Sequence, residues 1–363
     1  MAKKRTGISR ELLIHPGETI ADVLEERGIT QVELAMRTGV TPTYVSNVIH
    51  GKKDISAKFA MALEYALGVK KSFWLNLQAN YDAELLEINE AETVTEAERE
   101  AREHLNEIVK YLRKIGRLPL GETKEESILS LRGTLNVSDI SNIPRFAAVG
   151  AFRISENTAV DPFVLGAWIR LCQIAGEANS IDERFELTRV PELVDELKDV
   201  MLKHDGNIQK DLKNVMVRYG IDFSIAHHFT GAPVHGYVSL KRDGSYQMVV
   251  TIRRAFADEF WFSLFHELGH IVNGDISSGT KFVDDGSNPE MENRANAFAS
   301  ERLMQNNSYR EFIEAADFSL QSIERFAESQ RVMPYMVIGR LRRDKHLSYY
   351  QYNDHMLRYK WEQ

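Results

Sequence analysis

The pattern of hydrophobic and polar positions begins with a series of short segments that have helical spacing. Over the first 82 residues, apolar positions recur every three or four residues between residues that start and stop helices. Pro16 opens one segment and Gly28 closes it, whereas Thr30–Glu33 and Thr41–Pro42 have the spacing of helix N-terminal caps. The pattern predicts five short helices that form a compact all-α domain over residues 1–82.

A charged segment follows this domain. Residues 84–107 contain nine glutamates and only two arginines, Arg99 and Arg102. Such a charge run is typical of a solvated helical surface. We therefore expect an acidic helical linker over residues 83–122, interrupted near its end by Pro119 and Gly121.

The rest of the chain has mixed periodicity. An Asp243–Gly244 turn between two alternating runs, 237–242 and 245–252, predicts a β-hairpin. Helical spacing is found over 162–177, 191–203, 206–219, 255–273 and 289–304. We expect residues 123–304 to form a helical region leading into a second domain, and residues 305–363 to form a C-terminal helical extension. The predicted fold class is mainly α with a small β-sheet, that is, α+β.

Composition and charge narrow the function classes. The chain has 363 residues, 43% of them hydrophobic, which is enough for two or three globular domains. A single cysteine, Cys172, excludes an internal disulfide and points to a reducing compartment. There is neither an apolar run of membrane-spanning length nor a secretory signal at the start, so we expect a cytoplasmic protein with no membrane partner. Residues 1–82 carry 11 Lys and Arg against 9 Asp and Glu, whereas the net charge of the whole chain is −8. Only the first domain is therefore suited to bind phosphates.

The segment from Gln31 to Gly51 has the spacing of a helix-turn-helix motif. Its second helix would turn polar side chains toward the base edges of a DNA major groove. Gln31 would approach a phosphate from the start of the first helix, and two lysines would add charge for the DNA backbone. The predicted DNA-contacting residues are Gln31, Thr41, Thr43, Tyr44, Ser46, Asn47, Lys52 and Lys53. The alternative is a small helical packing domain that binds no DNA.

Residues 10–82 resemble the HigA-type antitoxins of the Xre/Cro helix-turn-helix superfamily. The resemblance rests on His15-Pro16-Gly17-Glu18 and on Gly51-Lys52-Lys53-Asp54-Ile55-Ser56, in addition to the motif itself. It implies a five-helix, lambda-repressor-like fold and a homodimer that binds an operator in double-stranded DNA.

The sequence His266-Glu267-Leu268-Gly269-His270 points to metal chemistry. Two histidines four residues apart lie on one helix face and can share a Zn²⁺ ion, while the adjacent glutamate can act as general base toward water. The polar residues of this otherwise apolar segment form a single stripe: Glu259, Ser263, His266, Glu267 and His270. Burying these polar groups without partners would be costly, and a metal ion with its bound water would provide the partners. The alternative is a pair of core histidines bonded to backbone groups.

A zinc site needs a third protein ligand, and the segment 289–304 offers one. Glu292 shares a helix face with Ala295 and Ala299, which would let two helices approach closely. Asn296, one turn after Glu292, is expected to orient a ligand by a hydrogen bond. The rival ligands are Asp275, Asp284, Asp285 and Glu290.

Residues of about 220–304 resemble the ImmA/IrrE metallopeptidase family. The resemblance rests on Phe262-x-x-Phe265-His266-Glu267-Leu268-Gly269-His270 and on Glu292-x-x-Ala295-Asn296-x-Phe298-Ala299. It implies a zincin-like domain in which His266, His270 and Glu292 bind zinc and Glu267 is the catalytic base. It also implies that the substrate is a helix-turn-helix repressor. The segment Ser300–Gln305 lacks the apolar run ending in proline that is usual in that family.

Two functions follow from these motifs. The first is a DNA-binding transcriptional regulator fused to a zinc-dependent endopeptidase that cleaves a partner regulator or a toxin–antitoxin protein. The second is a non-proteolytic, HigA-like antitoxin or repressor whose metal domain senses a ligand or binds a toxin. His235 and Tyr237 are candidate oxyanion donors between which the spacing does not select, and the hairpin could hold a peptide by strand addition.

Overall fold

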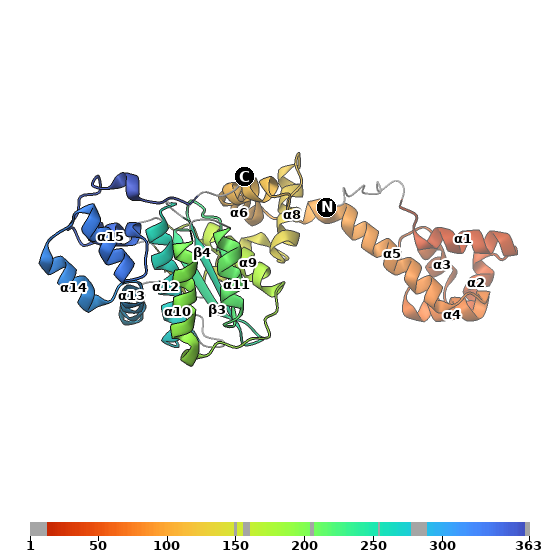
Figure 1. Ribbon diagram of the computed structural model, residues 1–363. Helices are drawn as coiled ribbons and strands as arrows, with labels where there is room; N and C mark the ends of the chain where they lie inside the picture. The colour runs from red at the N-terminus through yellow and green to blue at the C-terminus, as the bar shows by residue number, and fades with distance from the viewer. Residues whose placement is uncertain are drawn as a thin grey trace. The chain divides into compact units, whose positions relative to one another are not determined.

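The computed structural model describes residues 13–148, 151–154, 160–203, 207–252, 255–276 and 289–359. The chain divides into two compact units (Figure 1). One comprises the residues up to Arg99 together with Gly116–Ser130, and the other comprises Glu100–Ile115 together with the residues from Leu131 onward.

The first unit begins with the five predicted helices. These are α1 (Pro16–Arg27), α2 (Gln31–Thr38), α3 (Pro42–Ile49), α4 (Ala57–Leu67) and α5 (Lys71–Asn89). The predicted caps are present: Thr30 Oγ1 accepts a hydrogen bond from the backbone N–H of Glu33, and Thr41 Oγ1 accepts one from that of Tyr44. The helices enclose one apolar core, formed by Ile20, Leu24, Leu34, Val45, Val48, Phe59, Leu63 and Trp74.

The acidic segment differs from the expected solvated linker. Its first residues continue α5 to Asn89, and η2 (Glu90–Thr93), α6 (Glu96–His104) and α7 (Asn106–Lys114) follow. An apolar stripe along α6 and α7 is almost completely buried: Ala101, Leu105, Ile108, Val109 and Leu112. The segment is helical, as expected, but it is not solvated throughout, because these apolar positions keep helical spacing among the glutamates and Glu98 is itself fully buried. Next come α8 (Lys124–Leu135) and η3 (Ile140–Ala148).

The second unit is built on a four-stranded sheet in the order β1-β3-β4-β2. The predicted hairpin is present as β3 (Val234–Leu240) and β4 (Tyr246–Thr251), paired antiparallel. Two further strands, β1 (Ala151–Ile154) and β2 (Ile221–Ala226), were not predicted. β1 is antiparallel to β3, and β2 is parallel to β4. Neither has a tight turn joining it to its sheet neighbour, so no local signal announces the pairing.

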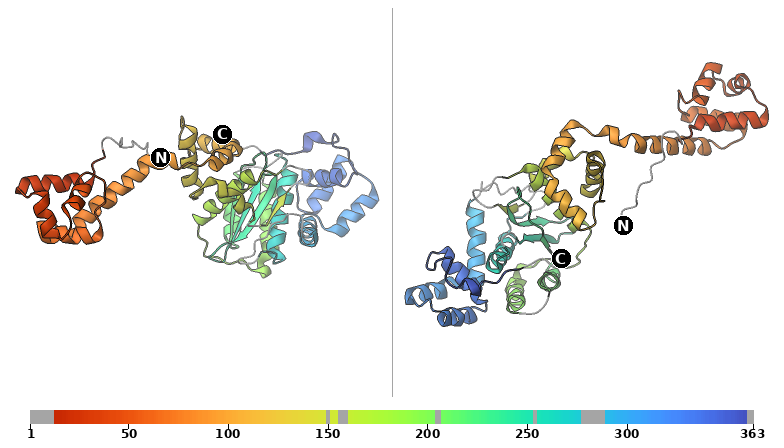
Figure 2. Two further views of the ribbon diagram at one scale, coloured as in Figure 1. Left: turned by 180° about the vertical axis from the view of Figure 1, so that it is seen from behind. Right: turned by 90° about the horizontal axis from the view of Figure 1, so that it is seen from above.

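Helices cover both faces of the sheet (Figure 2). On one face α9 (Pro162–Glu177) packs against β4: the side chain of Gln247 donates a hydrogen bond to the carbonyl of Cys172 in α9 at 2.6 Å. On the other face Val238, Met248 and Val250 pack toward α12 (Ala257–Val272). The helices α10 (Val190–Leu202) and α11 (Ile208–Val217), preceded by η4 (Leu187–Arg189), complete this second layer.

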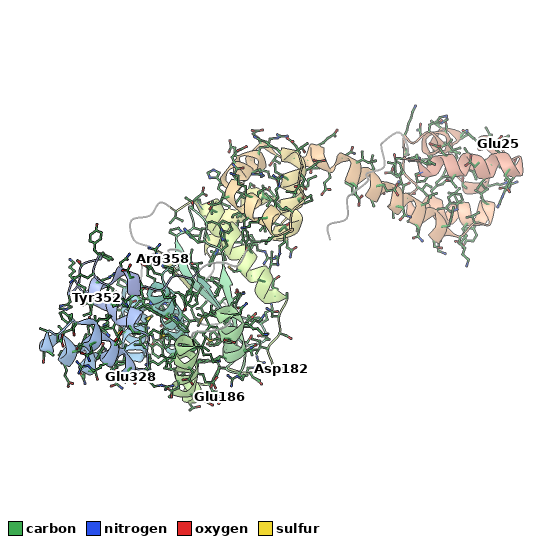
Figure 3. The ribbon with its side chains drawn as sticks, turned by 45° about the horizontal axis from the view of Figure 1, so that its top comes forward. Glu25, Asp182, Glu186, Glu328, Tyr352 and Arg358 are labelled. Carbon is green, nitrogen blue, oxygen red and sulfur yellow. The ribbon has the colours of Figure 1, made fainter. Side chains whose placement is uncertain are left out.

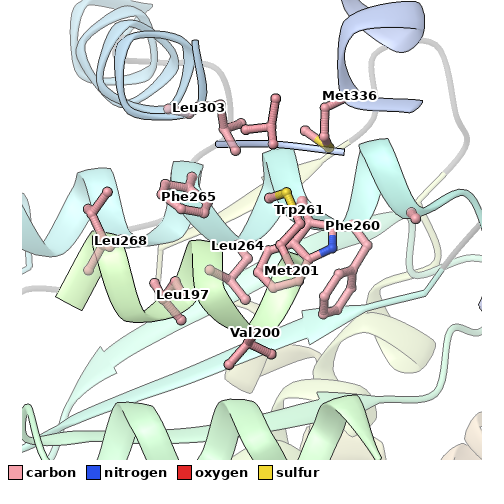
Figure 4. Close-up of a cluster of buried hydrophobic side chains, with 14 of the residues drawn as sticks. Leu197, Val200, Met201, Phe260, Trp261, Leu264, Phe265, Leu268, Leu303 and Met336 are labelled. Atoms are coloured by element: carbon pink, nitrogen blue, oxygen red, sulfur yellow. The ribbon is translucent and has the colours of Figure 1, made fainter. Parts of the chain in front are cut away.

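The core between α10 and α12 fixes the helix that carries the metal motif. Figure 4 shows Leu197, Val200 and Met201 of α10 against a row of large side chains on α12. That row consists of Phe260, Trp261, Leu264, Phe265 and Leu268, all exposed by 2% or less. Burying so many large apolar groups on one helix contributes several kcal/mol and leaves α12 little freedom to rotate.

The C-terminal part is helical, as expected. It contains α13 (Pro289–Leu303), α14 (Asn306–Ala315), α15 (Leu320–Ser329), α16 (Pro334–Arg343) and η5 (Asn353–His355). After η5 the chain returns to the start of α12, where Arg358 forms an isolated antiparallel bridge with Phe256. Within the described residues, no helix is long and apolar enough to cross a bilayer.

Candidate metal centre

The metal motif lies in the second half of α12, in the interior of the second unit. His266 and Glu267 are fully buried and His270 is 4% exposed. All three lie on the side of α12 that faces α13 and the start of β3, whereas the large apolar side chains face α10. Burial of this kind excludes bulk water from the polar stripe that the sequence predicted.

His266, His270 and Glu292 converge as predicted. The Nε2 atoms of the two histidines lie 3.0 Å apart, and Glu292 Oε2 and Oε1 lie 3.2 and 3.0 Å from His266 and His270 respectively. Their potential ligand atoms all fall within 4.8 Å of one another. Two imidazole nitrogens and one carboxylate are the donor set of a catalytic zinc site, and they leave a fourth coordination position open.

Each histidine is held from behind by an oxygen acceptor. Asn296 Oδ1 lies 3.0 Å from His266 Nδ1, and Asp275 Oδ2 lies 2.9 Å from His270 Nδ1. Arg294 in turn donates to the other oxygen of Asp275 at 2.7 Å. With both Nδ1 atoms engaged, the Nε2 lone pairs are directed into the shared space, so the residues present fit a zinc ion.

The electrostatics of the cluster favour a positive charge between its members. Burial lowers the pKa of His270, but the hydrogen bond to Glu292, the charge of Glu267 and the hydrogen bond to Asp275 outweigh it and raise that pKa to about 9. Burial alone would raise the pKa of Glu292, yet the two imidazoles hold it well below its usual range. A proton or a metal ion can supply the charge that these carboxylates require.

Glu267 packs directly against the backbone of β3. A Cβ atom placed on Gly236 would lie only 2.2 Å from Glu267 Oε1, so any side chain at this position would displace the carboxylate. No sequence pattern singled out Gly236, because its neighbour on α12 is 31 residues away along the chain.

The alternative ligands considered from the sequence differ in their positions relative to the two histidines. Asp275 is close to the site but contacts the rear nitrogen of His270, and Glu290 is exposed on α13. Asp284 and Asp285 lie outside the described residues. Asp275 was considered from the sequence only as a ligand, so its position behind His270 was missed. The backbone N–H of Asp275 donates to the carbonyl of His270 at 3.0 Å, and this turn brings the aspartate back to the ring.

The two candidate oxyanion donors, Tyr237 and His235, lie in different surroundings. Tyr237 packs edge-to-face against Trp168 of α9, so it lies on the sheet face opposite α12. His235 lines a cavity beside the metal cluster and remains a candidate. Strand addition to the hairpin is not supported, because β3 already pairs with both β1 and β4.

The predicted DNA-contacting residues lie together on the first unit. Thr41 and Thr43 are exposed at the start of α3, and Ser46 and Asn47 are half-buried one turn later. Gln31 opens α2, and Lys52 and Lys53 are exposed in the turn after α3. The backbone N–H groups of both lysines donate to the carbonyl of Asn47, which fixes this turn.

Tyr44 differs from the expected outward position. Its ring packs edge-to-face against Phe59 at 5.1 Å, and Lys53 Nζ lies 5.1 Å from the ring centre. The aromatic ring therefore contributes to the packing of α3 on α4 and lies next to a lysine, while the residue stays partly exposed.

Comparison with known proteins places each motif in a family. A family model described as helix-turn-helix matches residues 20–74, and one described as IrrE N-terminal-like domain matches residues 232–341. Virulence-associated protein A' of Dichelobacter nodosus is 44% identical over 69 residues, which cover 19% of this chain and 60% of that protein. Virulence-associated protein I of the same organism is 31% identical over 75 residues, covering 20% and 69%.

Solved structures resemble the same part of the chain. An addiction module antidote protein of a HigA family from Coxiella burnetii is 31% identical, with 23% of this chain and 96% of that chain covered and a TM-score of 0.21. The present chain spans less than two thirds of the first curated relative, 60% of its length. The chain is therefore a member of the helix-turn-helix family through residues 20–74 and carries an IrrE N-terminal-like peptidase domain over residues 232–341.

Proposed function

We propose that this regulator is a zinc-dependent endopeptidase that cleaves a partner protein, either a helix-turn-helix repressor or a component of a toxin–antitoxin pair. The observation that carries the proposal is the convergence of His266, His270 and Glu292 beside the buried carboxylate of Glu267. A cluster built only for stability would have no need of a fully buried glutamate in the same place.

The residues divide the chemistry between them. When bound, Zn²⁺ would polarise the scissile carbonyl and lower the pKa of water. His266, His270 and Glu292 would hold the ion, with Asn296 and Asp275 keeping the two rings in their ligating orientation. Glu267 would accept the proton of the attacking water and deliver it to the leaving amine. Gly236 keeps the space that this carboxylate occupies.

The first unit would bring this activity to an operator in double-stranded DNA. We assign base contacts to Thr43, Ser46 and Asn47, and phosphate contacts to Gln31, Thr41, Lys52 and Lys53, with Tyr44 in a supporting role. A homodimer would place two such helices on successive major grooves.

A second candidate is a repressor that acts as an antitoxin without proteolysis. It is favoured by the similarity of the first unit to a protein described as an addiction module antidote. In that case the metal cluster would sense an ion or contribute to a toxin-binding surface, and Glu267 would be dispensable.

Substitution Glu267→Gln separates the two candidates. It keeps the shape of the side chain and removes the base, so the peptidase function predicts full zinc content, normal DNA binding and no cleavage of the partner. Glu290→Gln, an exposed change on α13, is the matched control. If the Glu267→Gln protein regulates its operator in the same way as the parent protein, the non-proteolytic function is correct. Elemental analysis should give about one zinc per chain, lost in His266→Ala.

A further inference from the structure

β3 is the strand that lies against the carboxylate proposed as the catalytic base. Gly236 of β3 approaches Glu267 so closely that a Cβ atom on the glycine would lie 2.2 Å from Oε1 of the glutamate. Val238, two residues later on the same side of the strand, packs in the core that contains α12. A peptide that paired with the outer edge of β3 would therefore run within one strand spacing, about 4.8 Å, of the backbone that contacts Glu267.

That outer edge of β3 is occupied by β1. The sheet order β1-β3-β4-β2 makes β1 a terminal strand, and it lies on the side of β3 that faces away from β4. Ala151 pairs with Val238 and Phe152 pairs with Tyr237, in the antiparallel direction. The edge of a sheet is the place where an extended peptide can add a strand by main-chain hydrogen bonds. The chain's own β1 thus holds the position that an added peptide would take.

The pairing of β1 is short, and it is interrupted opposite Gly236. Ile154 pairs with Val234, so a single residue of β1 stands opposite two residues of β3, His235 and Gly236. A bulge of this kind disrupts the ladder locally. By contrast, all of β2, residues 221–226, pairs with β4 without a shift in register. β1 is therefore held by fewer main-chain hydrogen bonds than β2 and is the easier of the two strands to displace.

The elements before and after β1 are tightly packed, so a displaced β1 would stay near its site. Gly166 of α9 lies so close to η3 that a Cβ atom on this glycine would lie 2.2 Å from the carbonyl oxygen of Ile143. Beyond β1, the backbone N–H of Asp161 donates to the carbonyl of Gly231 at 2.8 Å, just before β3 begins. A strand tethered in this way competes with any other strand at a high effective concentration.

We propose that β1 is an autoinhibitory strand: it occupies the edge of β3, and an extended segment of the substrate must displace it to reach the metal centre. Because this edge binds by main-chain hydrogen bonds, its ligand is a locally unfolded peptide segment. β1 lies outside residues 232–341, which match the peptidase family model. Its role as an inhibitor rests on the proposed peptidase function, but the exchange of β1 for another strand depends on neither zinc nor catalysis.

A fluorophore-labelled synthetic peptide with the sequence of residues 149–156 tests the exchange. Its binding is measured by fluorescence anisotropy with the full chain carrying Glu267→Gln, so that the probe is not cut. The same chain with Ala151→Gly, Phe152→Gly and Ile154→Gly has a weakened β1, because glycine is a poor strand former. We expect this variant to bind the peptide about tenfold more tightly, since β1 no longer competes effectively.

N-methylated peptides show whether the probe binds as a strand. One probe is methylated on the backbone nitrogen that corresponds to Ala151, and the other on the nitrogen that corresponds to Phe152. The N–H groups of adjacent residues point to opposite sides of a strand, so only one of the two can donate to β3. One methylated peptide should therefore lose its affinity and the other should keep it.

A disulfide between β1 and β3 tests the proposal within a single protein, even if the glycine variant folds poorly. Ala151→Cys and Val238→Cys occupy paired positions, and the Cα separation of such pairs, about 4.5–5.5 Å, suits a disulfide. Oxidation should abolish peptide binding and reduction should restore it. Leu240→Cys with Tyr246→Cys joins β3 to β4 and is the matched control, in which oxidation should change nothing. The natural Cys172 is buried and should not interfere.

Equal affinity of the oxidised and reduced forms of the β1–β3 disulfide variant would overturn the proposal, as would equal affinity of the two methylated peptides. The peptidase function can fail separately. If the peptide exchanges with β1 as expected but Glu267→Gln changes no regulatory output, the edge of β3 remains a peptide-binding site and the peptidase function is rejected.

Discussion

Oδ2 of Asp275 lies 2.9 Å from Nδ1 of His270, and the same carboxylate also accepts a hydrogen bond from Arg294. The aspartate therefore does not compete with Glu292 as a ligand. It fixes the ring from behind and makes its Nε2 atom a better donor to a metal ion.

Asp275→Asn should weaken zinc binding by about 10- to 100-fold, because an amide orients the ring less strongly than a carboxylate does. Competition with a chromophoric chelator measures the change. Glu290→Gln removes one negative charge from the exposed surface of α13 and should leave the affinity unchanged. An unaltered affinity in Asp275→Asn would mean that Asp275 serves only to anchor Arg294.

Gly236→Ala should abolish peptidase activity while zinc remains bound. The new methyl group would overlap Glu267 Oε1, so the carboxylate must move, at a cost of about 1–3 kcal/mol in the free energy of unfolding. Gly133→Ala in α8 is the matched control, since its Cβ meets no atom within 4 Å. Denaturant unfolding and zinc analysis distinguish the two variants; normal activity in Gly236→Ala would contradict the placement of Glu267.

Asp258→Asn should stabilise the protein at high pH and have little effect at low pH. Burial, and then the charge of Glu259, raise the pKa of Asp258 from 3.8 to about 6. The folded state thus holds this proton more tightly than the unfolded state, so stability is lost as pH rises through about 4 to 6. The loss above pH 6 is about 3 kcal/mol, which the neutral asparagine avoids. Chemical denaturation at pH 8 and pH 4 tests the difference, with the exposed Glu311→Gln as control.

Thr43→Ala and Asn47→Ala should each weaken binding to a selected double-stranded DNA site by about 1–3 kcal/mol per lost base contact. Lys52→Ala should instead weaken binding to all DNA sequences equally. It should also reduce the slope of log K against log salt concentration by roughly one, the value for one lost phosphate contact. Glu25→Ala, exposed on α1, is the control (Figure 3). Gel shifts at several salt concentrations measure both effects. An unchanged DNA affinity in Asn47→Ala would contradict the placement of α3 in the major groove.

The local elements followed from the sequence because their signals are local. Thr30 and Thr41 cap helices within three residues of themselves, and Asp243–Gly244 closes a hairpin between adjacent strands. The spacing of His266 and His270 likewise places both on one face of a single helix. β1 and β2 escaped prediction because their partners lie far away in the chain, and the buried stripe of α6 and α7 was masked by the glutamates around it.

The sequence by itself determined which residue types could hold a metal and read a DNA groove, since helical periodicity and charge are properties of short segments. Only the tertiary structure decided that Asp275 stands behind His270, that Gly236 faces Glu267, and that Asp258 and Arg342 share one cavity. Such relationships depend on how helices and strands pack against one another, and the packing energy is spread over many side chains that carry no individual signal.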